Sequence, residues 1–229
     1  LEYSGYEYKN IELDGLYKNG GFDGQAAIDD DNGRVFMNGK INFSQKTPTF
    51  NFHADIEKVN PHNLHLTDKY KDATFSLNVD ANFTGHSIDD MIGQINVDSF
   101  AFVSPEKNYF MHNLNIAAKQ TNGRKSLELN SEFLKATIEG NYPYQTIPMS
   151  IMKTVERYIP SLLTMNKKHK EPHNDFNFDV HIYNTDILST VFNIPLNVYK
   201  HSTIKGYFND NDRKIKIDGY FPSVQYKNM

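Results

Sequence analysis

The chain has 229 residues, 38% of them hydrophobic, with a formal net charge of −4 and no cysteine. The lack of cysteine excludes a disulfide framework and a cysteine-based zinc site, and the weakly acidic balance argues against nucleic acid as the main partner. The hydrophobic fraction is low for a single thick core. No apolar run approaches the ~20 residues of a membrane helix, and no signal peptide opens the chain. We therefore interpret the chain as a fragment whose membrane anchor lies outside it.

Alternation of apolar and polar residues dominates residues 1–145, which we predict to form one stretch of β-strands. Each strand has a single apolar side, whereas strands buried on both faces would be apolar throughout. The connecting segments NGG, DNG and TNG are typical of tight hairpin turns. The pattern predicts an antiparallel meander whose clearest strands are Val35–Phe43, Phe50–Ile56, Phe75–Phe83, Ile95–Val97, Leu114–Ala118 and Leu127–Leu129.

One segment, residues 146–164, breaks the alternation. In TIPMSIMKTVERYIPSLL the apolar residues recur every three or four positions, which predicts an amphipathic helix with Thr146 as its N-cap. Its apolar stripe either packs over the sheet or lies on a membrane surface. The polar residues 165–175 are predicted to form a linker. Residues 176–229 return to alternation and are predicted to continue the sheet.

A short motif, an apolar residue followed by a polar residue and a glycine, recurs along the chain. Because residues i and i+2 face the same side of a strand, these glycines are expected on the apolar face. Each of them marks either a bend or bulge in a curved sheet, or space left for something that the sheet wraps. The seven glycines are Gly15, Gly24, Gly39, Gly85, Gly140, Gly206 and Gly219.

One-sided strands must bury their apolar side against something, since leaving it in water costs about 25 cal/mol per Å². A closed barrel, a second sheet or a bound apolar ligand would each serve. The low hydrophobic fraction favours a thin groove over a filled sandwich. The residues expected to line that groove are Met37, Ile41, Phe43, Phe50, Phe52, Phe75, Leu77, Val79, Phe83, Ile95, Val97, Phe176, Phe178, Ile182, Ile204 and Ile217.

Two stretches, IELDGLYKNGGFDG and TIKGYFNDNDRKIKIDGYFPSVQY, resemble the AsmA-like superfamily, and within it the Bacteroidota form of the TamB translocation and assembly module family. Residues 184–208 are similar to a strand–helix–strand element of that family. The resemblance implies an elongated, U-shaped antiparallel β-groove, called a β-taco, that is apolar inside and polar outside. It also implies an inner-membrane anchor, a path across the periplasm, and no catalytic residues or cofactor.

The resemblance further implies that the groove carries phospholipid between the inner and outer membranes. It implies support for outer-membrane protein assembly through a β-barrel partner of the TamA or BamA type. The alternative function is a β-rich protein-binding or adhesive module whose strands close into sandwiches.

Three other patterns are weighed against ordinary explanations. DDDNG at Asp29–Gly33 resembles part of a calcium loop but lacks the distal Glu, and it suits a hairpin turn. His62 and His65 could share a zinc ion, yet no third ligand is near in sequence. The run KKHKEPH suits either a solvated loop or contact with anionic headgroups. No catalytic motif is present, so neither an enzyme nor a metal site is predicted.

Overall fold

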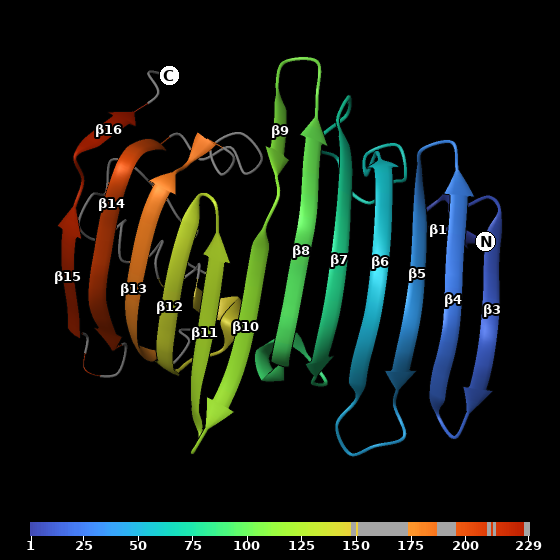
Figure 1. Cartoon of the computed structure of the whole chain (residues 1–229), viewed down its shortest axis with the longest axis horizontal. Coiled ribbons are helices and arrows are strands. Elements are labelled where there is room, and N and C mark those ends of the chain that lie inside the picture. The colour runs from blue at the N-terminus through green and yellow to red at the C-terminus, as the bar shows by residue number, and fades with distance from the viewer. Residues whose placement is uncertain (148–149, 151–173, 187–195, 210–211, 213, 227–229) are drawn as a thin grey trace.

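The computed structural model describes residues 1–147, 150, 174–186, 196–209, 212 and 214–226. Their strands form one 14-stranded sheet and a separate two-stranded sheet (Figure 1). The large sheet is antiparallel and is not closed into a barrel, as expected for an all-β groove. The fold class predicted from the sequence is therefore confirmed.

The strands follow one another across the large sheet almost entirely in chain order. The exceptions are β9, which pairs with β8 beside β10, and β16, which pairs with β14 beside β15. The strands are β1 (Glu2–Tyr3), β2 (Tyr6–Glu7), β3 (Ile11–Lys18), β4 (Gly21–Asp30), β5 (Gly33–Asn42), β6 (Thr49–Val59), β7 (Thr74–Thr84), β8 (Ile92–Val103), β9 (Asn108–Met111), β10 (Leu114–Thr121), β11 (Arg124–Ser131), β12 (Leu134–Asn141), β13 (Asp175–Asn184), β14 (Leu196–Asn209), β15 (Lys214–Tyr220) and β16 (Ser223–Tyr226).

The tight turns confirm the predicted hairpins. Asn19 and Gly20 join β3 to β4 with φ values of 51° and 73°, and Asn122 and Gly123 join β10 to β11 with 51° and 79°. Positive φ at both central residues defines the type I′ turn, whose twist suits a two-residue hairpin. The DDDNG segment also forms a hairpin connection, between β4 and β5.

The register places the apolar residues of successive strands on one face. Met37 lies opposite Ala54, Ala54 lies opposite Val79, and Val79 lies opposite Val97. The next row on the same face starts two residues away at Ile95 and runs through β10, β11 and β12 to β14, where Val180 lies opposite Ile204. We call this side of the sheet the apolar face and the other side the polar face.

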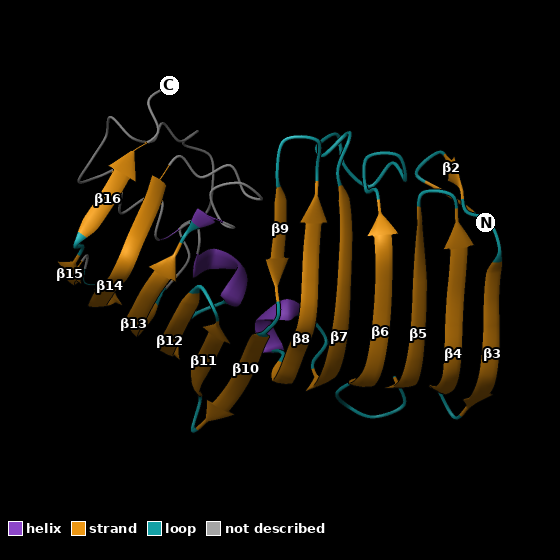
Figure 2. Cartoon of the chain, turned by 45° about the horizontal axis from the view of Figure 1, so that its top comes forward, coloured by secondary structure: helices purple, strands orange, loops and turns teal. Residues whose placement is uncertain are grey.

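The sheet bends along its length. In Figure 2, strands β11–β14 lie at an angle to strands β3–β7. Two short 3-10 helices, η1 (Ile88–Asp90) and η2 (Tyr144–Thr146), lie behind the sheet in the view of Figure 1. Because η2 leads into Ile147, which packs against Phe176 on the apolar face, that view shows the polar face.

Only a small part of the predicted helix and linker belongs to the described residues. Residues 148–149 and 151–173, which hold most of the predicted helix and linker, lie outside the described residues. Ile147 and Ser150 are helical. Thr146, the predicted N-cap, belongs to η2, and its hydroxyl donates a hydrogen bond to the Pro143 carbonyl at 2.8 Å. The next two residues of the predicted helix, 148–149, lie outside the described residues.

The end of the linker was also placed too late. Asn174 is fully buried and Asp175 already begins β13. Strand β13 pairs with β12. The predicted segments 1–145 and 176–229 therefore contribute strands to the same sheet.

Candidate apolar groove

The sixteen side chains predicted to line a groove all lie on the apolar face. Fifteen of them occupy positions in the register described above, and Phe43 joins them because its ring lies 5.8 Å from that of Phe50. Thirteen are partly exposed, Phe43 and Ile217 are exposed, and Phe176 is buried. A contiguous apolar surface that stays partly exposed is typical of a site that binds another molecule.

The face has two regions. The open region is the apolar face of β3–β8, and the covered region is that of β11–β14. In the open region Leu13 and Tyr17 of β3 are 70% and 72% exposed. In the covered region Tyr142, Ile147 and Phe176 keep no more than 7% exposure.

Aromatic side chains run across the open region. The Phe50 and Phe83 rings stack at 4.7 Å on adjacent strands, and Phe52 meets Phe83 edge-on at 6.4 Å. Toward one end of the strands, Tyr70 closes over Phe75 and Phe102 with ring distances of 5.2 and 6.1 Å. Aromatic pairs of this kind each add about 0.5–1.5 kcal/mol beyond burial, so they stabilise this region along with the small buried cluster that Tyr70 and Ala73 form with Phe102.

The covered region is closed by the chain between β12 and β13. Tyr142 and Ile147 pack on Phe176, and the Tyr142 hydroxyl donates a hydrogen bond to the Ile138 carbonyl at 2.8 Å. Burial raises the pKa of Tyr142 well above its ordinary value. The packing of Ile147 agrees with one of the two alternatives for the predicted apolar stripe, namely that it packs over the sheet. The contribution of Tyr142 was not predicted, although YPYQ directly before the predicted helix was a usable signal.

Two links between distant segments anchor the cover. The backbone N–H of Gln145 donates to Asp89 Oδ1 at 3.0 Å, and Lys125 Nζ donates to the Asp89 carbonyl. The same ammonium lies 4.6 Å from the centroid of the Tyr144 ring, within cation–π range. The cover is therefore tied to η1 and β11 as well as packed on the sheet.

The glycines on the apolar face do not leave space for a ligand. A Cβ at Gly39 would lie 2.2 Å from the Asn51 carbonyl oxygen and 2.7 Å from the Phe52 Cβ, and φ there is +149°. At Gly206 a Cβ would lie 2.5 Å from the Phe178 ring. Of the two interpretations, space for a ligand is thus wrong at these positions. The glycines allow neighbouring strands and aromatic rings to approach closely.

Two glycines depart from the predicted motif of an apolar residue, a polar residue and a strand glycine. Gly85 lies after the end of β7, where its N–H donates to the Pro48 carbonyl at 3.1 Å, so it is not a strand glycine. Gly93 was missed because an apolar Ile92 precedes it. It pairs with Phe83, and a Cβ would lie 2.2 Å from the Asn82 carbonyl oxygen. Its position two residues before Ile95 was the signal that placed it on the apolar face.

Charge is kept to the rims of the apolar face. Among its described strand positions the charged residues are Asp30 and Lys125, each at a strand end. The Asp30 carboxylate accepts hydrogen bonds from the Tyr6 hydroxyl and from the backbone N–H groups of Lys9 and Asn32. Burial raises its pKa, but these hydrogen bonds outweigh burial and hold the pKa below its ordinary value.

Among the described residues, the other candidate patterns do not bring together a set of metal ligands. Within the described residues, no group of three or more His, Cys, Asp or Glu side chains could hold a metal ion. His62 and His65 lie in a turn and line a 550 Å³ cavity with Ser4, Leu66, Thr67 and Asp68. Asp29, Asp30 and Asp31 of DDDNG each bind a different partner. Most of KKHKEPH lies outside the described residues.

Comparisons with models of protein families, with curated proteins and with solved structures found no match. No helix among the described residues is long and apolar enough to cross a membrane. The function is therefore inferred from the geometry of the sheet and its apolar face.

Proposed function

We propose that the chain is a segment of a periplasm-spanning bridge protein that carries phospholipid acyl chains along its apolar face. The observation that carries the proposal is the row of half-exposed apolar side chains over β3–β8. The buried aromatic cluster of this region, in which Tyr70 and Ala73 pack on Phe102, lies toward one end of the strands. Together with the resemblance to the TamB family, this row supports a path between the inner and outer membranes. A β-barrel partner and a role in outer-membrane protein assembly belong to the same proposal.

The energetics favour an acyl chain as the occupant. Each methylene group removed from water contributes about 0.8 kcal/mol, and an acyl chain brings no polar group that would need a partner. The strands of the open region place a single charged residue on the apolar face. This residue, Asp30, lies at the rim and accepts a hydrogen bond from Tyr6, so it does not disturb the apolar surface. Strands lie about 4.8 Å apart, so the six strands β3–β8 present a face roughly 25 Å across.

Adjacent residues of β7 give a matched test. Leu77 and Val79 lie on the apolar face and Asn78 lies between them on the polar face. A photo-crosslinking residue at Leu77 or Val79, in cells that express the full-length protein, is expected to capture phospholipid, while one at Asn78 is not. Mass spectrometry of the purified adducts identifies the captured molecule.

The crosslinking results distinguish phospholipid transport from protein binding. Capture at Asn78 but not at Leu77 or Val79, or capture at neither face, would overturn the proposal. Capture of polypeptide alone at Leu77 would favour a protein-binding module. The closed-sandwich form of that alternative does not fit the fold, because the described strands form one large sheet with only the two-stranded hairpin β1–β2 beside it.

A further inference from the structure

One edge of the large sheet is a strand that pairs on its inner side only, among the described residues. Strand β3 ends the strand order and pairs with β4 in an unbroken register. All eight of its residues are exposed. The hairpin β1–β2 forms a separate sheet and does not extend this edge. Figures 1 and 2 both show β3 as the outermost strand.

The backbone groups that point to the open edge belong to the residues on the apolar face. At the start of the strand, the N–H of Asp29 on β4 donates to the Asn10 carbonyl at 3.2 Å. At the other end, Lys18 and Gly21 flank the turn, where the first residue bonds the fourth. Hydrogen bonds to β4 therefore alternate through the even-numbered residues. The outward N–H and C=O groups are those of Ile11, Leu13, Gly15 and Tyr17.

Strand β3 lacks the devices that usually protect a sheet edge. Such edges carry a proline, a bulge or a charge on the inward side. The sequence IELDGLYK has no proline, its register has no bulge, and its charges lie on the polar face. Leu13 and Tyr17 are 70% and 72% exposed on the apolar face, and Leu16 is 64% exposed on the polar face. An exposed apolar edge with free backbone groups is suited to pairing with another strand.

We propose that two copies of the chain pair through β3, antiparallel, about a two-fold axis that passes through Gly15 normal to the sheet. This axis keeps both apolar faces on the same side, and every outward backbone group meets another. Glu12 of each copy then lies opposite Lys18 of the other copy, and Leu13 lies opposite Tyr17. Opposite charges and aromatic–aliphatic pairs both stabilise facing strands.

The charges select this register over its neighbours. A slip by two residues in one direction places Asp14 of one copy opposite Asp14 of the other, and like charges that face each other are destabilising. A slip in the other direction moves the residue opposite Glu12 out of β3 and into the turn. The proposed register is therefore the one that pairs both Glu12 residues.

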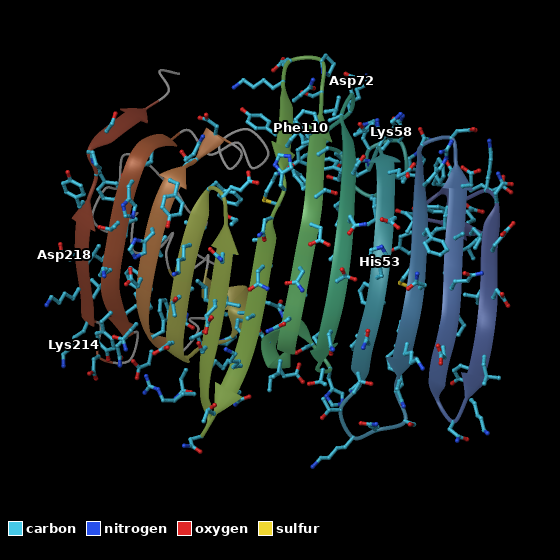
Figure 3. All side chains as sticks on the ribbon, viewed as in Figure 1. His53, Lys58, Asp72, Phe110, Lys214 and Asp218 are labelled. Atoms are coloured by element: carbon cyan, nitrogen blue, oxygen red, sulfur yellow. The ribbon has the colours of Figure 1, made fainter. Side chains whose placement is uncertain are left out.

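The opposite edge of the sheet gives the rival arrangement. Strand β15 ends the strand order on that side, and Figure 3 labels Lys214 and Asp218 along it. Head-to-tail pairing with β15 of a second copy would place Glu12 opposite Lys216, but this match covers only residues 11–14 of β3. It would also leave free edges at both ends of the assembly. The two-fold arrangement aligns residues 12–18 of both copies and closes with two chains.

Charge reversal tests the proposed register. Sedimentation equilibrium of the purified chain without lipid is expected to give a mass approaching twice the 26.4 kDa of one chain. Glu12→Lys and Lys18→Glu each create two like-charge pairs and should each weaken self-association at least tenfold. A mixture of the two variants restores both opposite-charge pairs and should form a heterodimer. Lys135→Glu, an exposed lysine in the middle of the sheet, is the control and should associate as the wild type does.

Cysteine crosslinking gives a second measurement, because the chain has no cysteine of its own. Facing residues 12 and 18 would have Cα atoms about 4.5 Å apart, within reach of a disulfide. In one chain these positions are about 20 Å apart. The double variant Glu12→Cys, Lys18→Cys should therefore form disulfide-linked dimers on oxidation.

Several results would overturn the proposal. These are a monomeric wild type, variants that do not associate when mixed, or no crosslinked dimer. Weaker association in Glu12→Lys with none lost in Lys18→Glu would instead indicate head-to-tail pairing with β15. Because no lipid takes part, a negative result would leave the proposed phospholipid transport standing.

Discussion

The open region and the covered region carry the same alternating sequence but have different surroundings. Phe52 of β6 and Phe176 of β13 both lie on the apolar face, both pair across strands with a glycine, and both stack near other aromatic rings. Phe52 is nevertheless partly exposed and Phe176 is 2% exposed. The difference comes from a segment elsewhere in the chain, because Tyr142 and Ile147 pack against Phe176.

The comparison teaches what each region can do. Side chains in the covered region stabilise the fold through burial, as an ordinary core does. Side chains in the open region contribute less to stability and remain free to meet another molecule. Substitutions matched between the two regions should therefore separate effects on folding from effects on ligand binding.

The largest effect is expected where the cover closes. Phe176→Ala should lower the free energy of unfolding by about 3–5 kcal/mol, the usual cost of emptying a buried phenylalanine site. Phe52→Ala should cost about half as much, because its ring is already partly in water. Urea denaturation followed by circular dichroism measures both, and equal losses would mean that the two regions are covered alike.

Glycine should be needed in both regions. Gly39→Ala is expected to cost more than about 2 kcal/mol, through its strained φ and the contact of the new Cβ with the Asn51 carbonyl. Gly123→Ala, in a turn with φ +79° and nothing within 4 Å of its Cβ, is the control and should cost about 1 kcal/mol. Should Gly39→Ala unfold at the same urea concentration as Gly123→Ala, close approach would not be the reason for the strand glycine.

A charge should distinguish the two regions by function. Val79→Lys in the open region should lower phospholipid capture at Leu77 several-fold, because an unpaired charge in an apolar path is costly. Its lysine can reach water, so the loss of stability should stay near 1 kcal/mol. Ile138→Lys, under the Tyr142 cover, should instead prevent folding. Normal capture by a folded Val79→Lys protein would argue against a lipid path over β7.

The smallest effect is expected on the polar face. The hydrogen bond to Asp80, aided by Asp55, raises the pKa of His53. The protonated ring therefore stabilises the fold below its unfolded pKa of about 6.5, and this stabilisation is lost as pH rises through the higher folded pKa. Because the site is on the surface, we expect less than about 1 kcal/mol.

The His53→Gln variant tests this pH dependence. The free energy of unfolding of the wild type should fall between about pH 6.5 and the folded pKa. The His53→Gln variant should lack that decline. A parallel pH profile for the two proteins would show that His53 is not its source.

Much of the fold could be predicted from local sequence. Strict alternation along Phe75–Phe83 fixes which side chains share a face, because a strand has a period of two, and the register confirms that face. Asn-Gly pairs fix the hairpins, because few other residues accept positive φ at both turn positions. The class of fold follows from these two signals together.

Local sequence did not predict why the strand glycines are needed or which segment covers Phe176. The spacing of Gly39 indicates its face, but only its pairing with Phe52 shows that strand approach, and not free space, requires it. Tyr142 and Ile147 lie next to β12 in sequence, yet their partner Phe176 is on β13. Such contacts depend on where the chain returns, which local periodicity does not encode.

By itself, then, the sequence determined an antiparallel sheet with one apolar face, since alternation and turn chemistry act over a few neighbouring residues. The tertiary structure decided which part of that face is closed and which is open, because burial depends on contacts between residues far apart in the chain. It also brought together His181 and His201, twenty positions apart, which only the pairing of β13 with β14 makes neighbours.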